Sequence, residues 1–226
     1  MTSKTDSTKL NRFTTIPVLL DLLIRRRLVF SDPKFWDDKN DTELLKIYRK
    51  SPLRSAMPAN KLLALCLLSE HETIHHWKTF ANGIGGCCIE FDKAKLTKLL
   101  SAQQSNGAAL RFGSVVYKRL KDVGDGAIDD CVEMLPFIKR WPYRFEREFR
   151  VIWEGNTDRY EIEIPDLTLI TGITLSQIMP KPLFRTIQVY CSDSFGIPIE
   201  TINHSTVYEN QKRWIGKYKR KFGTNP

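Results

Sequence analysis

An alternating run near the middle of the chain constrains its fold more than any other segment. Residues 141–153 read Trp-Pro-Tyr-Arg-Phe-Glu-Arg-Glu-Phe-Arg-Val-Ile-Trp. Because successive side chains of a strand point to opposite faces of a sheet, this alternation predicts a strand over 143–153. One face of that strand is aromatic and apolar, which suits a core. The other face carries Glu146 and Glu148, flanked by Arg144 and Arg150.

The two glutamates of this run would stand two residues apart on one sheet face. Like charges at that spacing repel, so the pattern is unfavourable for a strand with a purely structural role. The flanking arginines relieve the repulsion. We therefore interpret Glu146 and Glu148 as a functional pair, and the alternative is a salt-bridged, solvated strand face.

Length, hydropathy and cysteine content set the class of protein. The chain has 226 residues, 42% of them hydrophobic, which allows one large or two small domains with a real core. No apolar stretch approaches the roughly 20 residues of a membrane helix, and the polar N-terminus lacks the apolar central region of a signal peptide. We expect a cytoplasmic protein with no membrane partner. The five cysteines include no Cys-x-x-Cys spacing, so we expect reduced thiols and no metal site built from them.

The charge balance indicates an anionic partner. The net charge is +9 and the isoelectric point is near 9.3, which favours DNA, RNA or a nucleotide; a solvated basic surface is the alternative. In the basic tail, Trp214 and Tyr218 stand among lysines and arginines. They would either stack on bases or form the apolar stripe that docks a terminal helix.

The order of the elements predicts a mixed α+β class. We expect a disordered segment at 1–10, a single α+β domain over 11–205, and a basic C-terminal helix or tail over 206–226. The domain would contain mixed or antiparallel short strands with interspersed helices. Predicted helices cover 18–24, 42–49, 73–81, 93–101, 129–140 and 206–220. Predicted strands cover 28–31, 62–68, 85–91, 111–117, 143–153, 160–164, 168–173 and 186–191.

Two metal-dependent hypotheses arise from the motifs. His71-Glu72-Thr73-Ile74-His75 matches the zinc-peptidase pattern H-E-x-x-H, in which two histidines on one helix face bind zinc and the glutamate acts as base. The alternative for this motif is a polar loop with exposed histidines. A metal-dependent nuclease would need clustered carboxylates and a lysine. The chain offers Asp37, Asp38, Glu146, Glu148 and Lys139, with no spacing that enforces a site.

Several segments together resemble a large bacterial family known only as a domain of unknown function, number 2971. The segments are Leu28–Asp37, Leu65–Ser69, Trp77–Asp92, Val115–Tyr117 and Lys139–Arg150. They correspond to the family's strand that ends in serine, its Trp-x-x-Tyr-Ala helix with a following Gly-x-Cys-Ile-x-Phe, and its Glu-x-Glu-x-Arg strand. The chain departs from the pattern at Phe80, where the family has tyrosine, and at Ile84, where it often has histidine.

The layout also resembles, more weakly, the ADP-ribosyltransferases, which implies a core of that fold and NAD⁺ as the substrate. On this resemblance Glu148 is the catalytic carboxylate and Glu146 its assistant. Arg12 and Ser69 would contact NAD⁺, and Arg150 would neutralise its pyrophosphate or hold the carboxylates. Trp77 and Phe80 would form aromatic walls.

The resemblance implies an enzyme that modifies a nucleic acid or a protein, in bacterial or phage defence or as a toxin. In chemical terms, a carboxylate near the ribose would stabilise the positive charge that develops when the nicotinamide bond breaks. The alternative of a different class is a non-catalytic nucleic-acid-binding module. In that case the Glu-x-Glu-x-Arg face would be a ladder of salt bridges, and the basic tail would carry the binding.

Overall fold

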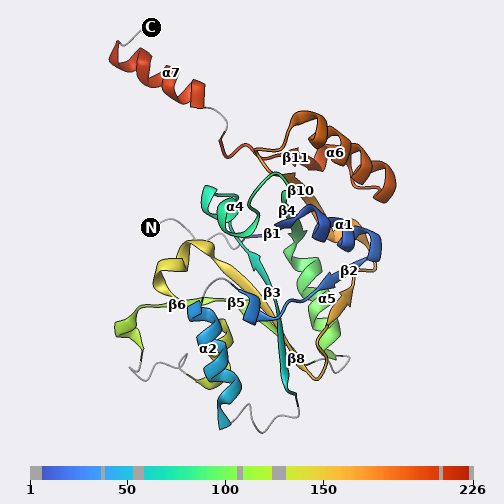
Figure 1. The fold of residues 1–226 in the computed structure, drawn as a ribbon, viewed down its shortest axis with the longest axis vertical. Helices are drawn as coiled ribbons and strands as arrows, with labels where there is room; N and C mark the ends of the chain where they lie inside the picture. The colour runs from blue at the N-terminus through green and yellow to red at the C-terminus, as the bar shows by residue number, and fades with distance from the viewer. Residues whose placement is uncertain are drawn as a thin grey trace.

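A seven-stranded sheet forms the centre of the molecule (Figure 1). The computed structural model describes residues 7–36, 39–52, 59–105, 109–123, 131–208 and 211–223. The strands of the sheet are β1 (Lys9–Thr15), β3 (Lys61–Leu68), β4 (Gly86–Asp92), β5 (Leu110–Ser114), β8 (Glu148–Gly155), β10 (Ile170–Leu175) and β11 (Ile202–His204). Their order is β11-β10-β4-β1-β3-β8-β5. Only the β10–β11 pair is parallel among these described strands; the other pairs are antiparallel.

Short strand pairs and helices surround this sheet. β2 (Arg27–Val29) pairs with β9 (Glu161–Glu163), and β6 (Val116–Lys118) pairs with β7 (Ile138–Arg140). The α-helices are α1 (Ile16–Arg25), α2 (Lys39–Lys50), α4 (Ile74–Phe80), α5 (Lys93–Ser105), α6 (Lys181–Phe195) and α7 (Gln211–Phe222). Two 3₁₀ helices matter below, η4 (Val132–Phe137) and η5 (Trp141–Glu146). The predicted mixed α+β class is confirmed.

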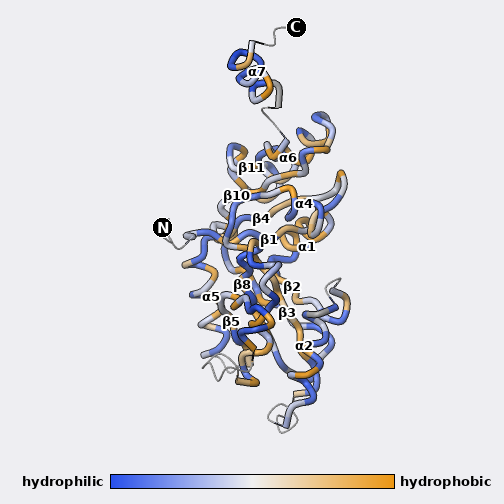
Figure 2. The backbone as a smooth tube through the Cα atoms, turned by 90° about the vertical axis from the view of Figure 1, so that its left-hand side faces the viewer, coloured by the Kyte–Doolittle hydropathy of each residue, from blue (hydrophilic) through white to orange (hydrophobic). Residues whose placement is uncertain are grey.

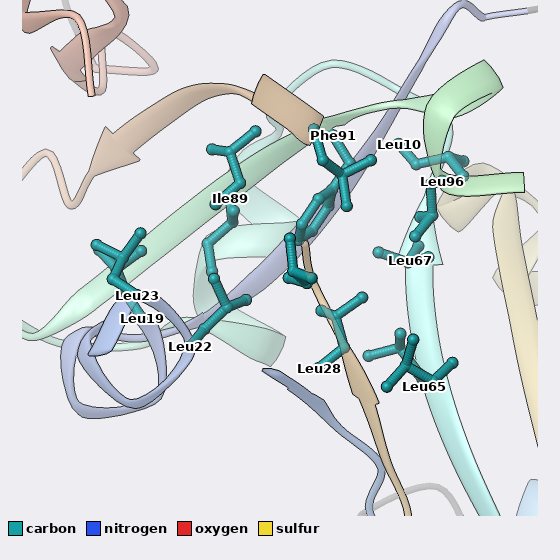
Figure 3. Close-up of a cluster of buried hydrophobic side chains, with 14 of the residues drawn as sticks. Leu10, Leu19, Leu22, Leu23, Leu28, Leu65, Leu67, Ile89, Phe91 and Leu96 are labelled. Carbon is teal, nitrogen blue, oxygen red and sulfur yellow. The ribbon is translucent and has the colours of Figure 1, made fainter. Parts of the chain in front are cut away.

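The main core lies on one face of the sheet. Leu63, Leu65 and Leu67 alternate along β3 and point into this core, as the period of two along a strand requires. α1 contributes Leu19, Leu22 and Leu23 to the same cluster, and Ile89 and Phe91 of β4 pack among them (Figure 3). Burial of each such leucine contributes about 2 kcal/mol of hydrophobic stabilisation.

The opposite face of the sheet carries two smaller apolar clusters. The first, here the α2 cluster, consists of Leu45, Tyr48, Leu62, Ala64, Phe137 and Ile152. The second, the α4 cluster, consists of Phe13, Leu68, Trp77, Ala81 and Cys88. Both clusters draw on β3, so the same strand that fills the main core also supports two separate groups of helices on its other side. The residues between the two clusters on this face are polar.

The strand predicted over 143–153 begins later than expected. β8 starts at Glu148, and residues 143–146 belong to the 3₁₀ helix η5. Arg147 has a φ of 46°, in the left-handed region, which ends η5 and turns the chain into the strand. From 148 to 153 the predicted alternation holds, because Phe149, Val151 and Trp153 enter the main core.

Several other predicted elements differ from the structure. The helix predicted over 129–140 is the 3₁₀ helix η4 followed by β7, and its first two residues lie outside the described ranges. The strand predicted over 186–191 is part of α6, and the strand over 111–117 is split into β5 and β6. The terminal helix begins at 211 rather than 206, after the unpredicted β11.

The N-terminal segment predicted to be disordered over 1–10 is ordered at its end. Lys9 and Leu10 belong to β1, where they pair with Asp92 and Phe91 of β4. Residues 1–6 lie outside the described residues. Over the described ranges, none of the helices has the length and hydropathy needed to cross a bilayer.

Close packing at the start of β4 generates a testable prediction. A Cβ atom on Gly86 would lie 1.9 Å from the carbonyl oxygen of Ala81, at the end of α4. We expect Gly86→Ala to destabilise the protein by about 2–3 kcal/mol, because backbone atoms must move to relieve this overlap. Urea denaturation measures the change. Gly113→Ala in β5, where a Cβ meets nothing within 4 Å, is the control; an equal loss in both variants would contradict the explanation.

Candidate functional site

A pocket opens between the α2 cluster and the α4 cluster, on the polar part of the second sheet face. Its volume is about 330 Å³, within the lower range of ligand sites. It is lined by Phe13, Phe35, Trp36, Asp41, Cys66, Leu68, His75, Thr79, Phe80, Lys139, Tyr143, Glu146, Glu148 and Arg150. The set combines aromatic walls with three carboxylates and two permanent cations. Counting these five groups alone, the lining carries one net negative charge.

The turn between η5 and β8 brings the two glutamates together. The left-handed Arg147 separates Glu146 from Glu148, so the two do not stand on one regular strand face. The Arg147 carbonyl accepts hydrogen bonds from the Ser69 backbone N–H at 3.0 Å and from the Ser69 hydroxyl at 2.7 Å. These two bonds stabilise a backbone conformation that L-residues rarely adopt. Ser69 thus holds the turn from which both carboxylates project.

Lys139 of β7 joins the carboxylates of the pocket. Its Nζ lies 2.6 Å from Glu146 Oε2, 3.3 Å from Glu148 Oε2 and 3.4 Å from Asp41 Oδ2. Burial opposes the charged form of Lys139, but Glu148, Asp41 and Glu146 outweigh it, and the pKa of Lys139 is raised. The side chain therefore remains a cation that compensates three buried acids.

Arg150 fixes the orientation and the charge of Glu148. Its Nε and Nη2 donate to the two oxygens of Glu148 at 2.5 and 3.0 Å, Nη2 also contacts Asp41, and Nη1 donates to the Pro136 carbonyl. Burial favours the neutral acid, since Glu148 is 4% exposed, yet Arg150 and then Lys139 outweigh it and lower the pKa of Glu148 to about 2. Glu148 is thus a buried carboxylate that is ionised at neutral pH.

Glu146 has different surroundings from Glu148. It is 2% exposed, and the contacts of its carboxylate are Lys139 and His75, whose Nε2 lies 3.5 Å from Glu146 Oε1. His75 is positioned by α4, which begins at Ile74 because the Thr73 side chain caps it by accepting from the His76 N–H. Thr79 and Phe80 follow one turn later on the same helix and also line the pocket.

The predicted site residues divide into two groups. Glu146, Glu148, Phe80 and Arg150 line the pocket, but Arg12, Ser69 and Trp77 are not among the lining residues. Arg12 follows Asn11 and precedes Phe13 on β1, so it points to the face opposite Phe13, and its Nη2 donates to the Val29 carbonyl at 3.4 Å. Trp77 packs in the α4 cluster and donates from Nε1 to Glu72 at 2.8 Å.

The H-E-x-x-H motif at 71–75 does not adopt the helical arrangement that a zinc peptidase needs. His71 lies in the segment before α4 and His75 within it, so the two histidines do not share a helix face. The carboxylate of Glu72 accepts from Trp77 and from the Ser205 hydroxyl. Over the described residues, no three His, Cys, Asp or Glu side chains form a group that would hold a metal ion. Asp37 and Asp38, proposed above for a nuclease, lie outside the described residues.

Sequence reasoning missed several residues of the pocket. Asp41 stands in the first turn of α2 and meets Arg150 across 109 positions of sequence, a pairing that no local pattern reveals. From the sequence, Lys139 has a predicted functional role only under the nuclease hypothesis, and Trp36 and Tyr143 have none. Both rings make cation–π contacts in the pocket. The Arg150 guanidinium lies 5.0 Å from the centre of the Trp36 ring, and the Lys139 Nζ lies 4.9 Å from the centre of the Tyr143 ring.

A patch of arginines and aromatic rings lies on η5, the 3₁₀ helix that carries Tyr143 and Glu146 into the pocket, and is completed by Arg119 from the segment after β6. We call it the mouth patch: Arg119, Trp141, Arg144 and Phe145. Arg119 lies 4.4 Å and Arg144 4.8 Å from the Trp141 ring centre, and Arg144 lies 4.0 Å from that of Phe145. Phe145 is 69% exposed. Exposed rings between guanidinium groups suit bases and phosphates of a single strand.

Comparisons with known proteins give distant structural similarity alone. No family model matches the chain, and no curated protein matches it. Two solved structures of DarT from Thermus sp. 2.9 are similar. The complex with NAD⁺ has a TM-score of 0.40 at 10% identity and covers 90% of this chain and 98% of DarT. The complex with ADP-ribosylated ssDNA has a TM-score of 0.42 at 9% identity, with 90% and 97% covered. Membership of the domain-of-unknown-function family stays a prediction.

The depressed pKa of Glu148 predicts a specific dependence of stability on pH. The carboxyl ionises near pH 2 when folded and near its usual 4.5 when exposed. The resulting stabilisation is present above about pH 4.5 and is lost as the pH falls toward about 2. We therefore expect the difference in unfolding free energy between wild type and Glu148→Gln to shrink by on the order of 3 kcal/mol from about pH 7 to about pH 2.

Urea denaturation at a series of pH values measures this difference. The control is Glu43→Gln, which removes an exposed carboxylate of α2. Its difference from wild type should stay nearly constant over the same range. A constant difference for Glu148→Gln as well would contradict the ionised, buried state assigned to Glu148.

Proposed function

We propose that this protein cleaves the bond between nicotinamide and ribose in NAD⁺ and transfers the ADP-ribosyl group to a nucleic acid. The observation that carries the proposal is a negatively charged pocket floor beneath aromatic walls. Glu148 and Glu146 form that floor, and Trp36, Phe80 and Tyr143 stand around it. The nicotinamide ring of NAD⁺ is a pyridinium cation while it is bonded to the ribose, and such a ring is attracted both by carboxylates and by the faces of other rings.

Glu148 is proposed as the catalytic carboxylate. As the nicotinamide–ribose bond breaks, its electron pair leaves with nicotinamide and positive charge develops on the ribose. A carboxylate already ionised and held rigidly stabilises that charge without reorganising, which is the most effective form of electrostatic catalysis. The contact of Glu148 with Lys139, at 3.3 Å, is longer than its contacts with Arg150. A ribose hydroxyl would therefore replace Lys139 more readily than Arg150.

Glu146 is proposed to serve the acceptor. The incoming nucleophile forms a bond to the ribose carbon and loses a proton, and Glu146 is the carboxylate placed to accept it. The neighbouring His75, at 3.5 Å, is the group that would receive the proton next. Arg150 positions Glu148 rather than the pyrophosphate, because its Nε, Nη1 and Nη2 all have protein partners. This is one of the two roles predicted for it from the sequence.

The pocket volume suits the nicotinamide ribose end of NAD⁺ better than the whole molecule. The rest would extend toward the mouth patch, where Arg119 and Arg144 offer positive charge. The same patch supports a nucleic acid rather than a protein as the acceptor, because rings and guanidinium groups alternate there beside the pocket. Arg12 and Ser69 have other contacts in the structure, and the proposal does not need either of them as a contact of NAD⁺.

A competing function is a nucleic-acid-binding module without catalysis. The observation in its favour is that both glutamates have buried ion-pair partners, as a structural network would require. The two functions differ in whether NAD⁺ is consumed. They also differ in the effect of a variant that fills the pocket and leaves every ion pair in place. Such a variant would abolish NAD⁺ binding by the enzyme and would leave nucleic-acid binding by the module unchanged.

NAD⁺ turnover tests the proposed function directly. We expect the purified protein to release nicotinamide from NAD⁺, and Glu148→Gln to lower the rate by about 10²–10³-fold, the usual effect of removing one group that stabilises transition-state charge. Because Glu148→Gln also weakens the ion-pair network, Thr79→Trp is the second variant. It fills the pocket from α4 without removing a charge.

The control for Thr79→Trp is Lys78→Trp, on the same helix but not lining the pocket. We expect NAD⁺ binding, measured by calorimetry, to be lost in the first variant and kept in the second. If wild type neither binds nor consumes NAD⁺ with or without DNA and RNA, the catalytic proposal is wrong and the binding module takes its place.

The mouth patch generates a separate prediction about the acceptor. We expect Trp141→Ala with Phe145→Ala to weaken binding of a single-stranded oligonucleotide by about tenfold or more, because each ring that stacks on a base is worth about 1–3 kcal/mol. The affinity for NAD⁺ should change much less. Fluorescence anisotropy measures the first quantity and calorimetry the second. Tyr190→Ala removes an exposed ring of α6 and should leave both unchanged; a loss there of equal size would refute the assignment.

A further inference from the structure

The C-terminal helix α7 stands apart from the rest of the molecule. Both views show it beyond α6 and β11, away from the sheet (Figures 1 and 2). Among the described residues, no hydrogen bond or ion pair joins α7 to another element. Its four large apolar side chains are exposed: Trp214 by 65%, Ile215 by 51%, Tyr218 by 48% and Phe222 by 65%. A stripe of this kind on a helix normally has a partner surface.

The two kinds of side chain on α7 are cleanly separated. Trp214, Tyr218 and Phe222 follow one another at intervals of four, and Ile215 lies beside them, so these residues share one face. The Trp214 and Tyr218 rings are 5.3 Å apart and the Tyr218 and Phe222 rings are 6.0 Å apart, which makes the stripe continuous. The remaining surface carries Arg213, Lys217, Lys219, Arg220 and Lys221, and the helix contains no acidic residue.

We propose that α7 binds the surface of an anionic lipid bilayer, lying parallel to it with the aromatic stripe at the level of the headgroups. Its twelve residues span about 18 Å, which is too short to cross a bilayer but enough to lie on one. Lysines and arginines beside an apolar stripe extend their charged ends toward anionic headgroups while their methylene chains stay near the apolar layer. In such a helix the apolar face is buried at the headgroup boundary while the basic face attracts the anionic lipids.

The charge of α7 and the packing of its rings favour a bilayer over a second copy of the helix or a nucleic acid as the partner. A second copy of α7 would bring the six lysines and arginines of its sequence against the same six, and like charges repel at the short distance of a helix pair. A nucleic acid would attract the cations, but the rings of α7 pack against one another and not against guanidinium groups as in the mouth patch, so their faces are less free to stack on bases. An anionic bilayer satisfies the cations and buries the stripe together. The absence of a membrane partner expected above rested on spanning segments, and surface binding needs none.

This inference does not depend on the proposed function. The pocket lies between α2 and α4, and no residue of α7 lines it. The helix would bring the protein to a lipid surface whether or not the pocket consumes NAD⁺. Variants in α7 should therefore leave thermal stability and pocket chemistry as they are in wild type.

Co-sedimentation of the full chain with lipid vesicles tests the proposal. We expect strong binding to vesicles of phosphatidylcholine and phosphatidylserine in roughly equal parts and little binding to phosphatidylcholine alone, since each cation near an anionic surface contributes to affinity. Trp214→Ser with Tyr218→Ser keeps every cation, and Lys217→Glu with Arg220→Glu keeps every ring. Each pair should weaken binding about tenfold or more.

Two controls make the result specific. Lys98→Glu with Lys181→Glu changes the net charge by the same amount on α5 and α6 and should bind the vesicles like wild type. Trp214→Phe keeps the stripe, so it should bind, but the blue shift of tryptophan emission on binding should be much smaller than in wild type. The shift reports that Trp214 itself enters the apolar layer.

Three outcomes would overturn the proposal. One is equal or no binding to both kinds of vesicle, which would leave α7 to an anionic partner other than a bilayer. Another is a serine pair that binds anionic vesicles like wild type, which would reduce the effect to bulk charge. The third is vesicle binding that the charge-matched control loses equally. Single-stranded DNA binding that falls only in the Glu pair, without vesicle binding, would assign the helix to nucleic acid instead.

Discussion

The ion-pair network around Lys139 is the interaction on which the site depends. Three carboxylates meet two cations in a buried space between two apolar clusters, and each charge is tolerable only because the others are present. Taking one partner away leaves an uncompensated charge in a medium of low dielectric constant, which is far more costly than losing a surface salt bridge. The network therefore links the stability of the fold to the charge state of the pocket.

This network also explains how the second face of the sheet carries both apolar clusters and a polar pocket. β3 and β8 lie side by side, and on the second face β3 carries leucine, alanine and cysteine side chains whereas β8 carries three charged side chains and Ile152. Leu62 and Ala64 face Glu154 and Ile152 at one end, whereas Cys66 and Leu68 face Arg150 and Glu148 at the other. The α2 cluster covers the first part. The second part holds the pocket, where Arg150 of β8 and Lys139 of β7 compensate the carboxylates.

The sequence allowed much of the fold to be predicted and only part of the site. The continuous apolar run Leu62–Leu68 reflects burial on both faces, and the recurrence of Phe149, Val151 and Trp153 at every second position marks the side of β8 that enters the main core, so β3 and β8 were predictable. The alternation also runs through 143–147, where the structure has a 3₁₀ helix. A left-handed residue at Arg147 has no sequence signal of its own. Residues 186–191 contain β-branched and aromatic side chains, yet Pro182 in the first turn and packing of Cys191 place them in α6. Asp41 and Lys139 reach the pocket only through tertiary contacts.

The residues of the pocket come from distant parts of the chain, and this has a consequence for biosynthesis. Phe13 stands on the first strand and Arg150 on β8, so the walls and the floor are separated by most of the domain. Contacts of such long range form late in folding, because loop closure must come before them. A nascent chain that has emerged only as far as β7 holds Lys139 and Asp41 but has neither glutamate to place between them. Whatever chemistry the pocket performs is therefore withheld until β8 has left the ribosome and joined the sheet.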